Sequence, residues 1–153
     1  MATTTIQVSL HHEPFHPLAL LADWDNDLSG LTGELPAASA AFVGRMRGTD
    51  GGGAPLVALE LEHYPGMTEA QIERFAHQIQ QAHGALAVRV AHRVGRVAPG
   101  EALVLVAVAA DRRGQAQRAC SELLEALKHD APFWKKECRA DGTAHWLQGN
   151  SPL

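Results

Sequence analysis

The distribution of hydrophobic and polar positions along the chain predicts five β-strands. Apolar and polar residues alternate in Thr3–Leu10 and in Leu56–Glu62, as expected for strands that bury one face. Leu86–Val94 and Ala102–Ala110 are valine-rich and almost continuously apolar, so both are expected to be largely buried. Ala37–Gly44 is rich in Ala and Ser, which is poor for a strand. It is nevertheless short, apolar and bounded by turn signals, and we predict a buried strand here as well.

Helical spacing of apolar residues predicts helices between these strands. A short helix over Pro17–Trp24 has proline at its start and an acidic, turn-forming exit at Asp25–Gly30. A longer helix is expected to begin at Thr68, which is a good N-cap residue with Gln71 at the capping-box position. Gly84 is expected to end this second helix.

A third helix is predicted over Gly114–Lys128, where apolar residues follow one face and Pro132 limits further extension. Strands and helices are mixed without strict βαβ alternation. The sequence therefore predicts an α+β fold with a largely antiparallel sheet and two main helices packed on it. The 153 residues, of which 46% are apolar and 20% charged, are expected to form one domain.

The first ten residues, the lengths of the apolar stretches and the two cysteines bear on the cellular location of the protein. The first ten residues lack a positive region and alternate in polarity, so they predict a strand and not a signal peptide. No stretch approaches the roughly 20 apolar residues that span a bilayer, and we expect a cytoplasmic protein that does not bind membranes. Cys120 and Cys138 stand far apart, which fits neither a disulfide scaffold nor a zinc ribbon.

Charge is distributed unevenly along the chain, although the formal net charge is only −4. Residues 1–44 contain five acids and no lysine or arginine. Residues 112–139 contain seven bases against four acids, an excess that would hold an anion if folding gathers it. The global charge argues against bulk nucleic-acid binding, and a compact anionic ligand in one pocket fits better.

Other candidate motifs favour structural roles. The segment Gly48–Pro55, GTDGGGAP, lacks the P-loop lysine and predicts a flexible loop. His11, His12 and His16 have no carboxylate or cysteine partner at a metal-binding spacing, so no metal site is predicted. Cys120 falls on the apolar face of its helix, where a core residue is favoured over a nucleophile.

The segment from Lys128 to Glu137, KHDAPFWKKE, combines a helix end, a proline turn, two aromatic residues and further lysines. Phe133 and Trp134 are expected to be buried and to hold the turn, which would keep Lys128 and Lys135 close together with their ammonium groups at a rim. A solvated basic turn is the alternative, and this segment alone does not decide between them.

Three further tracts accompany that segment: FVGRMR at residues 42–47, LEHYPGM at 61–67 and HRVGRVAPGE at 92–101. Together with LK..APFWKKE at 127–137 they resemble the large, catalytic subunit family of molybdopterin synthase, in the same order and with similar spacing. Gly142 and Trp146 are similar to the family's C-terminal strand, so the resemblance covers about residues 37 to 146. It implies an α/β-hammerhead-like fold.

The resemblance also implies an activity and partners. Members of the family convert cyclic pyranopterin monophosphate into molybdopterin by installing two sulfurs as a dithiolene. The donor is the C-terminal Gly-Gly thiocarboxylate of a small ubiquitin-like carrier subunit, so neither a metal nor a redox cofactor is needed. The family further implies a homodimer with one carrier at each end, which is a heterotetramer.

Site residues follow from the resemblance position by position. Lys128 corresponds to the principal catalytic lysine and Lys135 to the second one. The expected substrate-binding residues are Arg45, Met46, Arg47, Arg112, Arg113, Lys136 and Glu137. Among these Arg47 is favoured for gripping phosphate or pterin oxygens, because a guanidinium forms two parallel hydrogen bonds.

Two positions depart from the family pattern. Arg112 stands where the family usually has histidine, and arginine cannot transfer protons near neutral pH. The position near Asn150 lacks an arginine that the family often places by the neighbouring subunit's site. Three hypotheses follow: an active synthase, a catalytically altered relative that still binds the carrier, and a module that binds RNA or another polyanion.

Overall fold

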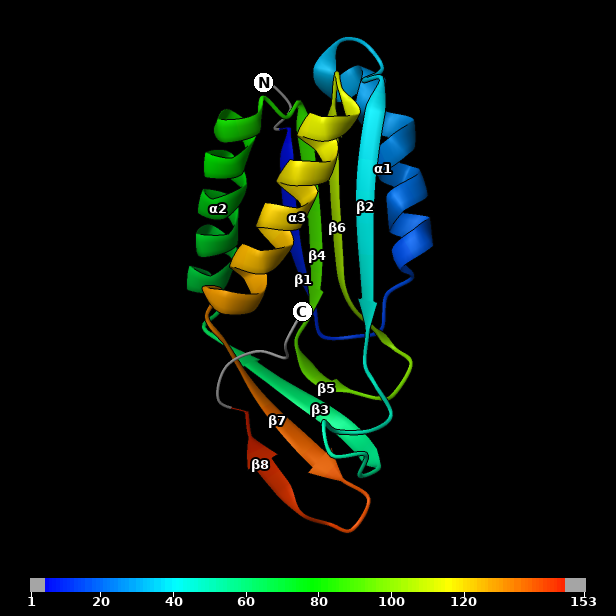
Figure 1. The fold of residues 1–153 in the computed structure, drawn as a ribbon, viewed down its shortest axis with the longest axis vertical. Helices are drawn as coiled ribbons and strands as arrows, with labels where there is room; N and C mark the ends of the chain where they lie inside the picture. Colours follow the sequence, from blue (N-terminus) through cyan, green and yellow to red (C-terminus); the bar gives the residue numbers. More distant parts are fainter. Residues whose placement is uncertain (1–4, 148–153) are drawn as a thin grey trace.

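The computed structural model describes residues 5–147, whose elements are labelled in Figure 1. The helices are α1 (Pro17–Thr32), α2 (Met67–His83) and α3 (Arg113–His129). The strands are β1 (Ile6–His11), β2 (Ala38–Arg45), β3 (Leu56–His63), β4 (Ala87–Arg93), β5 (Gly95–Val97), β6 (Ala102–Ala110), β7 (Phe133–Arg139) and β8 (Ala144–Trp146).

The strands form two four-stranded sheets. The first has the order β1-β4-β6-β2, in which β1 runs parallel to β4 and the other pairs are antiparallel. The second has the order β5-β3-β7-β8 and is wholly antiparallel. In Figure 1 the second sheet lies beyond one end of the first. The α+β class and the largely antiparallel pairing are confirmed, and the strands divide between two sheets.

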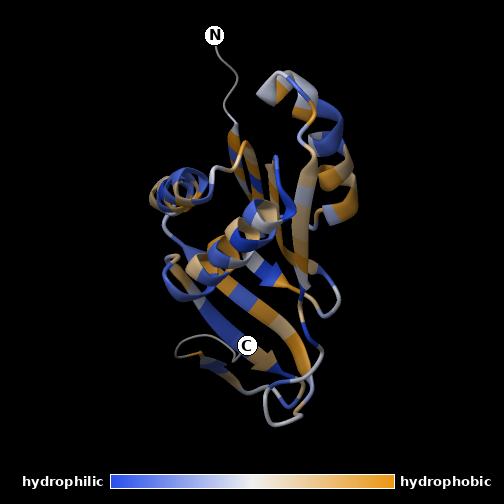
Figure 2. Ribbon diagram, turned by 45° about the horizontal axis from the view of Figure 1, so that its top comes forward, coloured by the Kyte–Doolittle hydropathy of each residue, from blue (hydrophilic) through white to orange (hydrophobic). Residues whose placement is uncertain are grey.

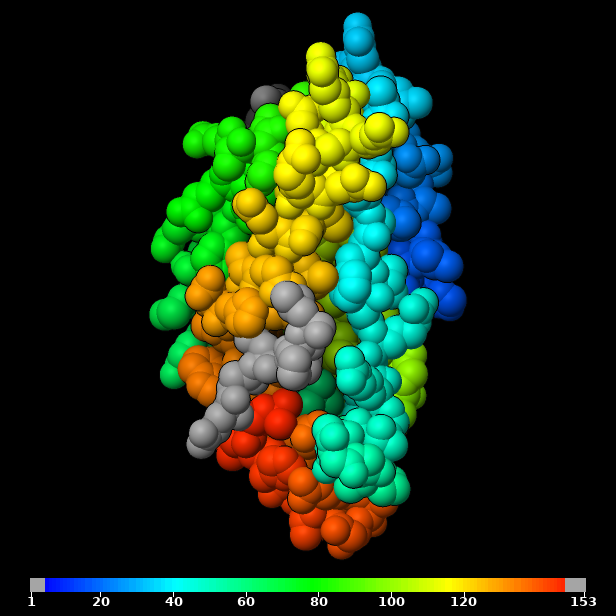
Figure 3. Space-filling view, viewed as in Figure 1, coloured from blue at the N-terminus to red at the C-terminus, as the bar shows by residue number. Residues whose placement is uncertain are grey.

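Helices cover both faces of the first sheet. On one face α2 and α3 pack against the valines of β4 and β6 in a single apolar cluster. On the opposite face α1, which was expected to be only a short helix, packs against the alanines of the same two strands. Figure 2 shows hydrophilic and hydrophobic residues mixed along each helix, as expected for helices that bury one side. Figure 3 shows α3 lying between α2 and β2.

Helix α1 continues through the segment predicted to be a turn. Trp24 and Leu28, four residues apart, are 2% and 1% exposed and pack on small side chains of the sheet, Ala87, Ala107 and Ala109. This burial outweighs the weak helix propensity of the Asp, Asn and Ser residues around them. The helix ends at Gly33, whose positive φ of 87° suits glycine.

Strand β2 was predicted correctly, but its burial was not. It pairs with β6 alone and is an edge of the first sheet, so only some of its side chains are covered. Phe42 in its middle remains 36% exposed. The apolar composition therefore reflects a partly covered edge and not a central strand. For β1, the predicted start at Thr3 lies outside the described residues.

Helix α2 begins slightly earlier than predicted. Its N-cap is Gly66, whose N–H donates to the Glu69 carboxylate at 3.2 Å, so Glu69 holds the capping-box position given to Gln71. Thr68 lies inside the first turn, and its hydroxyl accepts the Tyr64 N–H at 3.2 Å. The predicted end at Gly84 is confirmed. Cys120 lies on the buried face of α3 and belongs to the core, as predicted, and burial raises the pKa of its thiol to about 11.

Strand β7 follows α3 and was not recognised in the sequence. It pairs with β3, with Lys135 opposite Leu61 and Lys136 opposite Glu60. Alternation along the strand sends Lys135 and Lys136 to opposite faces of the second sheet. Phe133 is partly buried, whereas Trp134 is 44% exposed beside Tyr64, so the expectation that both aromatic residues are buried is wrong for Trp134.

Candidate active site

A cavity of about 480 Å³ lies where the two sheets meet the end of α3. Its wall combines apolar residues of β2, β3 and β6 with charged side chains from several elements. Four bases line it, Arg45, Arg47, Lys128 and Lys135, against two acids, Asp50 and Glu137. Positive charge therefore exceeds negative charge around a partly apolar space, which suits an anion attached to a ring system.

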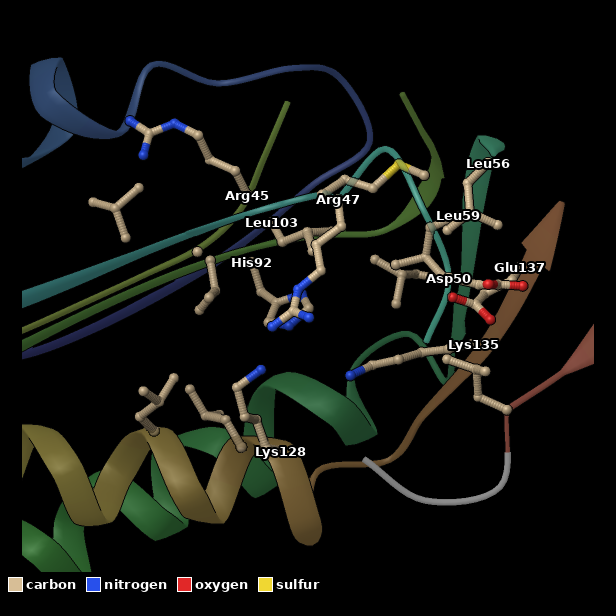
Figure 4. A pocket seen from close by; sticks show the side chains of 18 of the residues that line it. Arg45, Arg47, Asp50, Leu56, Leu59, His92, Leu103, Lys128, Lys135 and Glu137 are labelled. Carbon is tan, nitrogen blue, oxygen red and sulfur yellow. The ribbon is translucent and has the colours of Figure 1, made fainter. Parts of the chain in front are cut away.

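Lys128 and Lys135 reach the cavity from different elements. Lys128 lies in the last turn of α3 and Lys135 on the inner face of β7, and both are partly buried. In Figure 4 their side chains point toward the same space. Burial lowers the pKa of Lys135, and the positive charge of Lys128 lowers it further. The expected proximity of these lysines is therefore present in the fold.

The tract at the end of β2 enters the cavity at an irregular point of the strand. The register shifts between Gly44 and Arg45, and Met46 is then held by its N–H, which donates to the Glu101 carbonyl at 2.9 Å. Met46 is 5% exposed and packs in a small apolar cluster under the cavity. In Figure 4 Arg47 extends toward the lysines, whereas Arg45 extends in another direction.

The two acids of the cavity wall have defined partners. Asp50 accepts the N–H groups of Gly52 and Ala54 at 2.9 and 2.8 Å and the Arg139 Nε at 2.9 Å. The loop 48–55, which was expected to be flexible, is therefore anchored by the Asp50 side chain. Glu137 lines the cavity from β7, and one of its oxygens lies 3.5 Å from His145 Nε2.

His92 also lines the cavity, although it was not predicted to be a site residue. It is 7% exposed, and its ring stacks on Phe133 with centroids 4.1 Å apart and planes 15° apart. Its Nδ1 lies 2.7 Å from the carbonyl oxygen of Arg93. Burial lowers the pKa of His92 to about 4. The signal in the sequence was its place in the tract HRVGRVAPGE, which begins near the end of β4.

Three predicted substrate-binding residues lie outside this cavity. Lys136 is on the other face of the second sheet, 2.9 Å from the Glu60 carboxylate and 5.3 Å from the centre of the Trp146 ring. Arg112 and Arg113 are exposed at the start of α3. Because Lys128 is near the end of that helix, a rise of 1.5 Å per residue separates it from Arg113 by about 22 Å. Asn150 lies outside the described residues.

Fold and site together define a mixed α+β protein with a cationic cavity between two sheets, and known proteins share this architecture. A family model described as MoaE protein matches residues 14–130. The molybdopterin synthase catalytic subunit of Rhizobium meliloti (strain 1021) is 49% identical over 107 residues, which are 70% of this chain and 67% of that protein. The chain belongs to the MoaE family, the catalytic subunits of molybdopterin synthase, and is an enzyme of molybdenum cofactor biosynthesis.

Solved structures agree with this assignment. A molybdopterin biosynthesis MoaE protein from Burkholderia ambifaria MC40-6 superposes with a TM-score of 0.76 at 35% identity, over 95% of this chain and 91% of that one. A protein–protein complex of subunits 1 and 2 of molybdopterin-converting factor from Helicobacter pylori 26695 contains the same fold, with a TM-score of 0.73, 19% identity and coverage of 95% and 91%. None of the helices within residues 5–147 is long and apolar enough to cross a membrane.

Proposed function

We propose that this chain transfers sulfur from the C-terminal thiocarboxylate of a small ubiquitin-like carrier to cyclic pyranopterin monophosphate, forming the dithiolene of molybdopterin. The observation that carries the proposal is the meeting of Lys128, Lys135 and Arg47 around one cavity in a member of the MoaE family. Phosphate and thiocarboxylate are both anions. A cavity with excess positive charge and an apolar wall suits them together with a pterin ring.

The two lysines take different parts in this proposal. Lys128 contacts the incoming thiocarboxylate or the acyl intermediate and stabilises the charge that develops there. Lys135, whose pKa is lowered by burial and by Lys128, supports the same anionic centre and exchanges a proton more readily than an ordinary lysine. Arg47 binds phosphate or pterin oxygens, because its guanidinium extends toward the lysines. The chain's own residues thus supply cations and orientation.

A second hollow, of about 240 Å³, supports the entry of an extended carrier tail. It shares Leu127, Lys128, Lys135 and Leu147 with the cavity and continues past Trp134. A Gly-Gly tail has no side chains and fits a narrow path of this kind. The Helicobacter pylori complex of subunits 1 and 2 supports a small-subunit partner for this chain as well.

A homodimer would explain why Arg112 and Arg113 lie far from the cavity of their own chain. Residues about 22 Å from Lys128 along α3 cannot contact the same small anion. In a dimer each chain can present its α3 start to the cavity of the other. We therefore propose a homodimer with one carrier bound to each chain, located in the cytoplasm.

Reconstitution tests the proposal against its alternatives. The purified chain is mixed with a thiocarboxylated carrier and cyclic pyranopterin monophosphate, and molybdopterin is measured. An active synthase forms product and requires the carrier's Gly-Gly end. A catalytically altered relative binds the carrier without forming product, and this outcome would point to Arg112. Binding of RNA that falls steeply with salt and ignores the carrier would instead indicate a polyanion-binding module.

A further inference from the structure

We propose that His92 is a positioning residue of the cavity, a neutral imidazole whose Nε2 accepts a hydrogen bond from the ammonium group of Lys135. Three observations support this role: the bond at Nδ1, the stacking on Phe133 and the position of the ring in the cavity wall. The activity part of the test rests on the proposed function, whereas the lysine and imidazole measurements do not.

The backbone fixes which nitrogen of His92 carries the hydrogen. Nδ1 lies 2.7 Å from the carbonyl oxygen of Arg93, and a carbonyl oxygen only accepts. Nδ1 must therefore be the donor. In a neutral ring the lone pair is then on Nε2, which makes this nitrogen an acceptor.

The charges around His92 keep its ring neutral. Burial has the largest effect on the His92 pKa of about 4, and the bond to the Arg93 carbonyl opposes it. Lys135, Lys128 and His63 each disfavour a further positive charge on the ring. The Arg47 side chain extends toward the same space in Figure 4. At neutral pH the cavity therefore contains one uncharged acceptor among several cationic donors.

Packing fixes the direction in which that acceptor points. Phe133 covers the ring at a centroid distance of 4.1 Å with nearly parallel planes, and the Nδ1 edge is bound to the backbone. Nε2 is the remaining polar atom of a ring that lines the cavity. Phe133 and Lys135 are two residues apart on β7 and share its inner face, so the stacking partner of His92 places Lys135 beside it.

The consequence is a lysine with a defined orientation and charge. Burial and Lys128 disfavour the charged form of Lys135, and an acceptor at Nε2 favours it. His92 thus limits the loss of the ammonium form of Lys135. It also binds one ammonium hydrogen of Lys135, which then points toward the ring and away from the substrate.

Two substitutions separate this role from a purely structural one. His92→Phe keeps an aromatic ring to stack on Phe133 but removes both nitrogens. His92→Gln places an amide oxygen near the position of Nε2 and restores an acceptor. The pKa of Lys135 is measured in the free protein by trace acetylation between pH 6 and 11, with each lysine followed by mass spectrometry. Lys136, on the other face of the sheet, is the internal control.

In His92→Phe we expect the pKa of Lys135 to fall, so that its acetylation below pH 9 is roughly three to ten times faster than in wild type. His92→Gln should return toward the wild-type rate, and Lys136 should change in neither variant. Unchanged acetylation of Lys135 in His92→Phe, or equal changes in both variants, would overturn the proposal. A change confined to Lys128 would overturn the choice of Lys135 as the donor.

A measurement on the wild-type protein does not depend on any variant folding. Nitrogen NMR of ¹⁵N-histidine protein should show His92 protonated at Nδ1 and accepting at Nε2 at pH 7, and a hydrogen on Nε2 would contradict the proposal. In the molybdopterin assay the alkaline limb of kcat should move to lower pH in His92→Phe and recover in His92→Gln, with KM unchanged. A wild-type chain that forms no molybdopterin would refute the proposed function while leaving the lysine titration readable.

Discussion

Lys128 lies at the boundary between the core and the cavity. It follows the core residues Leu123 and Leu127 on α3, and its side chain lines the cavity. Lys128→Ala should leave the free energy of unfolding within roughly 0.5 kcal/mol of wild type, since no core contact is removed. Loss of a preorganised cation should raise the barrier by about 3–4 kcal/mol and abolish measurable molybdopterin formation. Single-turnover assays measure the effect on the barrier, and urea unfolding measures the effect on stability.

Lys136→Ala is the matched control for that variant. Its ammonium pairs with Glu60 on the other face of the second sheet, so only a mild effect on turnover is expected. Carrier affinity should survive in both variants, because a broad interface contributes to it. If Lys128→Ala retained more than about a tenth of wild-type turnover, a barrier change below ~1.4 kcal/mol, its role as the principal catalytic residue would be rejected.

Lys135 should make the folded protein less stable at neutral pH. Burial and Lys128 lower its pKa, so between that lowered value and the ordinary one the unfolded chain binds more protons than the folded chain. Stability attributable to this residue therefore rises with pH across that window. Lys135→Met should increase the free energy of unfolding at pH 7 by on the order of 1 kcal/mol while abolishing turnover.

Urea unfolding at pH 7 and at pH 10 tests whether the stability attributable to Lys135 rises with pH. The advantage of Lys135→Met over wild type should shrink at pH 10, where a smaller fraction of Lys135 is protonated in the folded state than at pH 7. Lys136→Met should show no such advantage, because Glu60 raises the pKa of Lys136. A Lys135→Met protein that is less stable than wild type at pH 7 would show that contacts of its aliphatic chain or ammonium outweigh the cost of burial.

Some site residues were predictable one at a time, and others were not. Lys128 and Lys135 could be paired from the sequence because a helix end and a following turn bring them together over only seven positions. His92 could not, since its function depends on a backbone carbonyl and on a ring from a strand 41 positions later. Lys136 points away from the cavity because it lies on strand β7, and the charged residues of this segment made the strand hard to recognise in the sequence.

At the scale of elements, the loop 48–55 depends on one carboxylate. Asp50→Ala removes the acceptor of the Gly52 and Ala54 N–H groups and the partner of Arg139. Amide exchange at Gly52 and Ala54 should become at least about tenfold faster, as NMR can measure. Asp141→Ala, in a nearby turn held through Thr143, is the control and should leave those two amides unchanged.

The same anchor predicts a dependence on pH. Hydrogen bonds from the Ala54 N–H and from Arg139 lower the pKa of Asp50. The contribution of Asp50 to the stability of the loop is therefore fully present above the ordinary pKa of an aspartate. It is lost as the pH falls through the lowered pKa of Asp50. Exchange at Gly52 should accelerate only in that acid range. The loop is also expected to become more protected when substrate or carrier binds, and identical exchange with and without them would contradict this.

Strands and helices were predictable where local pattern and tertiary packing agree. The two central strands Ala87–Arg93 and Ala102–Ala110 satisfy both, and they were placed almost correctly. The second half of α1 was missed because Leu28 is buried by alanines that are distant in the sequence. Strand β5 was missed for another reason: it has only three residues, too few for a periodic signal.

At the scale of the whole molecule, one chain does not bring all its predicted site residues together. The cavity lies at the end of α3, whereas Arg112 and Arg113 lie at its start. The proposed homodimer predicts a sedimentation mass of two chains at micromolar concentration, and of a heterotetramer when the carrier is added. Monomers alone under both conditions would rule out this assembly.

Mixed dimers test whether Arg113 serves the cavity of the partner. Lys128→Ala and Arg113→Ala are each expected to be inactive as homodimers, the first through the loss of the catalytic ammonium and the second through weakened binding of the anion. Co-refolding equal amounts gives heterodimers in half of the assemblies. If Arg113 acts across the interface, one cavity of each heterodimer keeps both residues, and about a quarter of wild-type activity should return.

The arithmetic differs if both residues act within one chain. Every cavity of the heterodimer then lacks either Lys128 or Arg113, so mixing restores nothing. Lys128→Ala mixed with Lys135→Met is the matched control, because these two residues line the same cavity of one chain and cannot complement each other. Recovery in the first mixture but not in the second would place Arg113 in the partner's cavity. No recovery in either would mean that the start of α3 contributes nothing across the interface, and full activity of Arg113→Ala alone would remove it from the site.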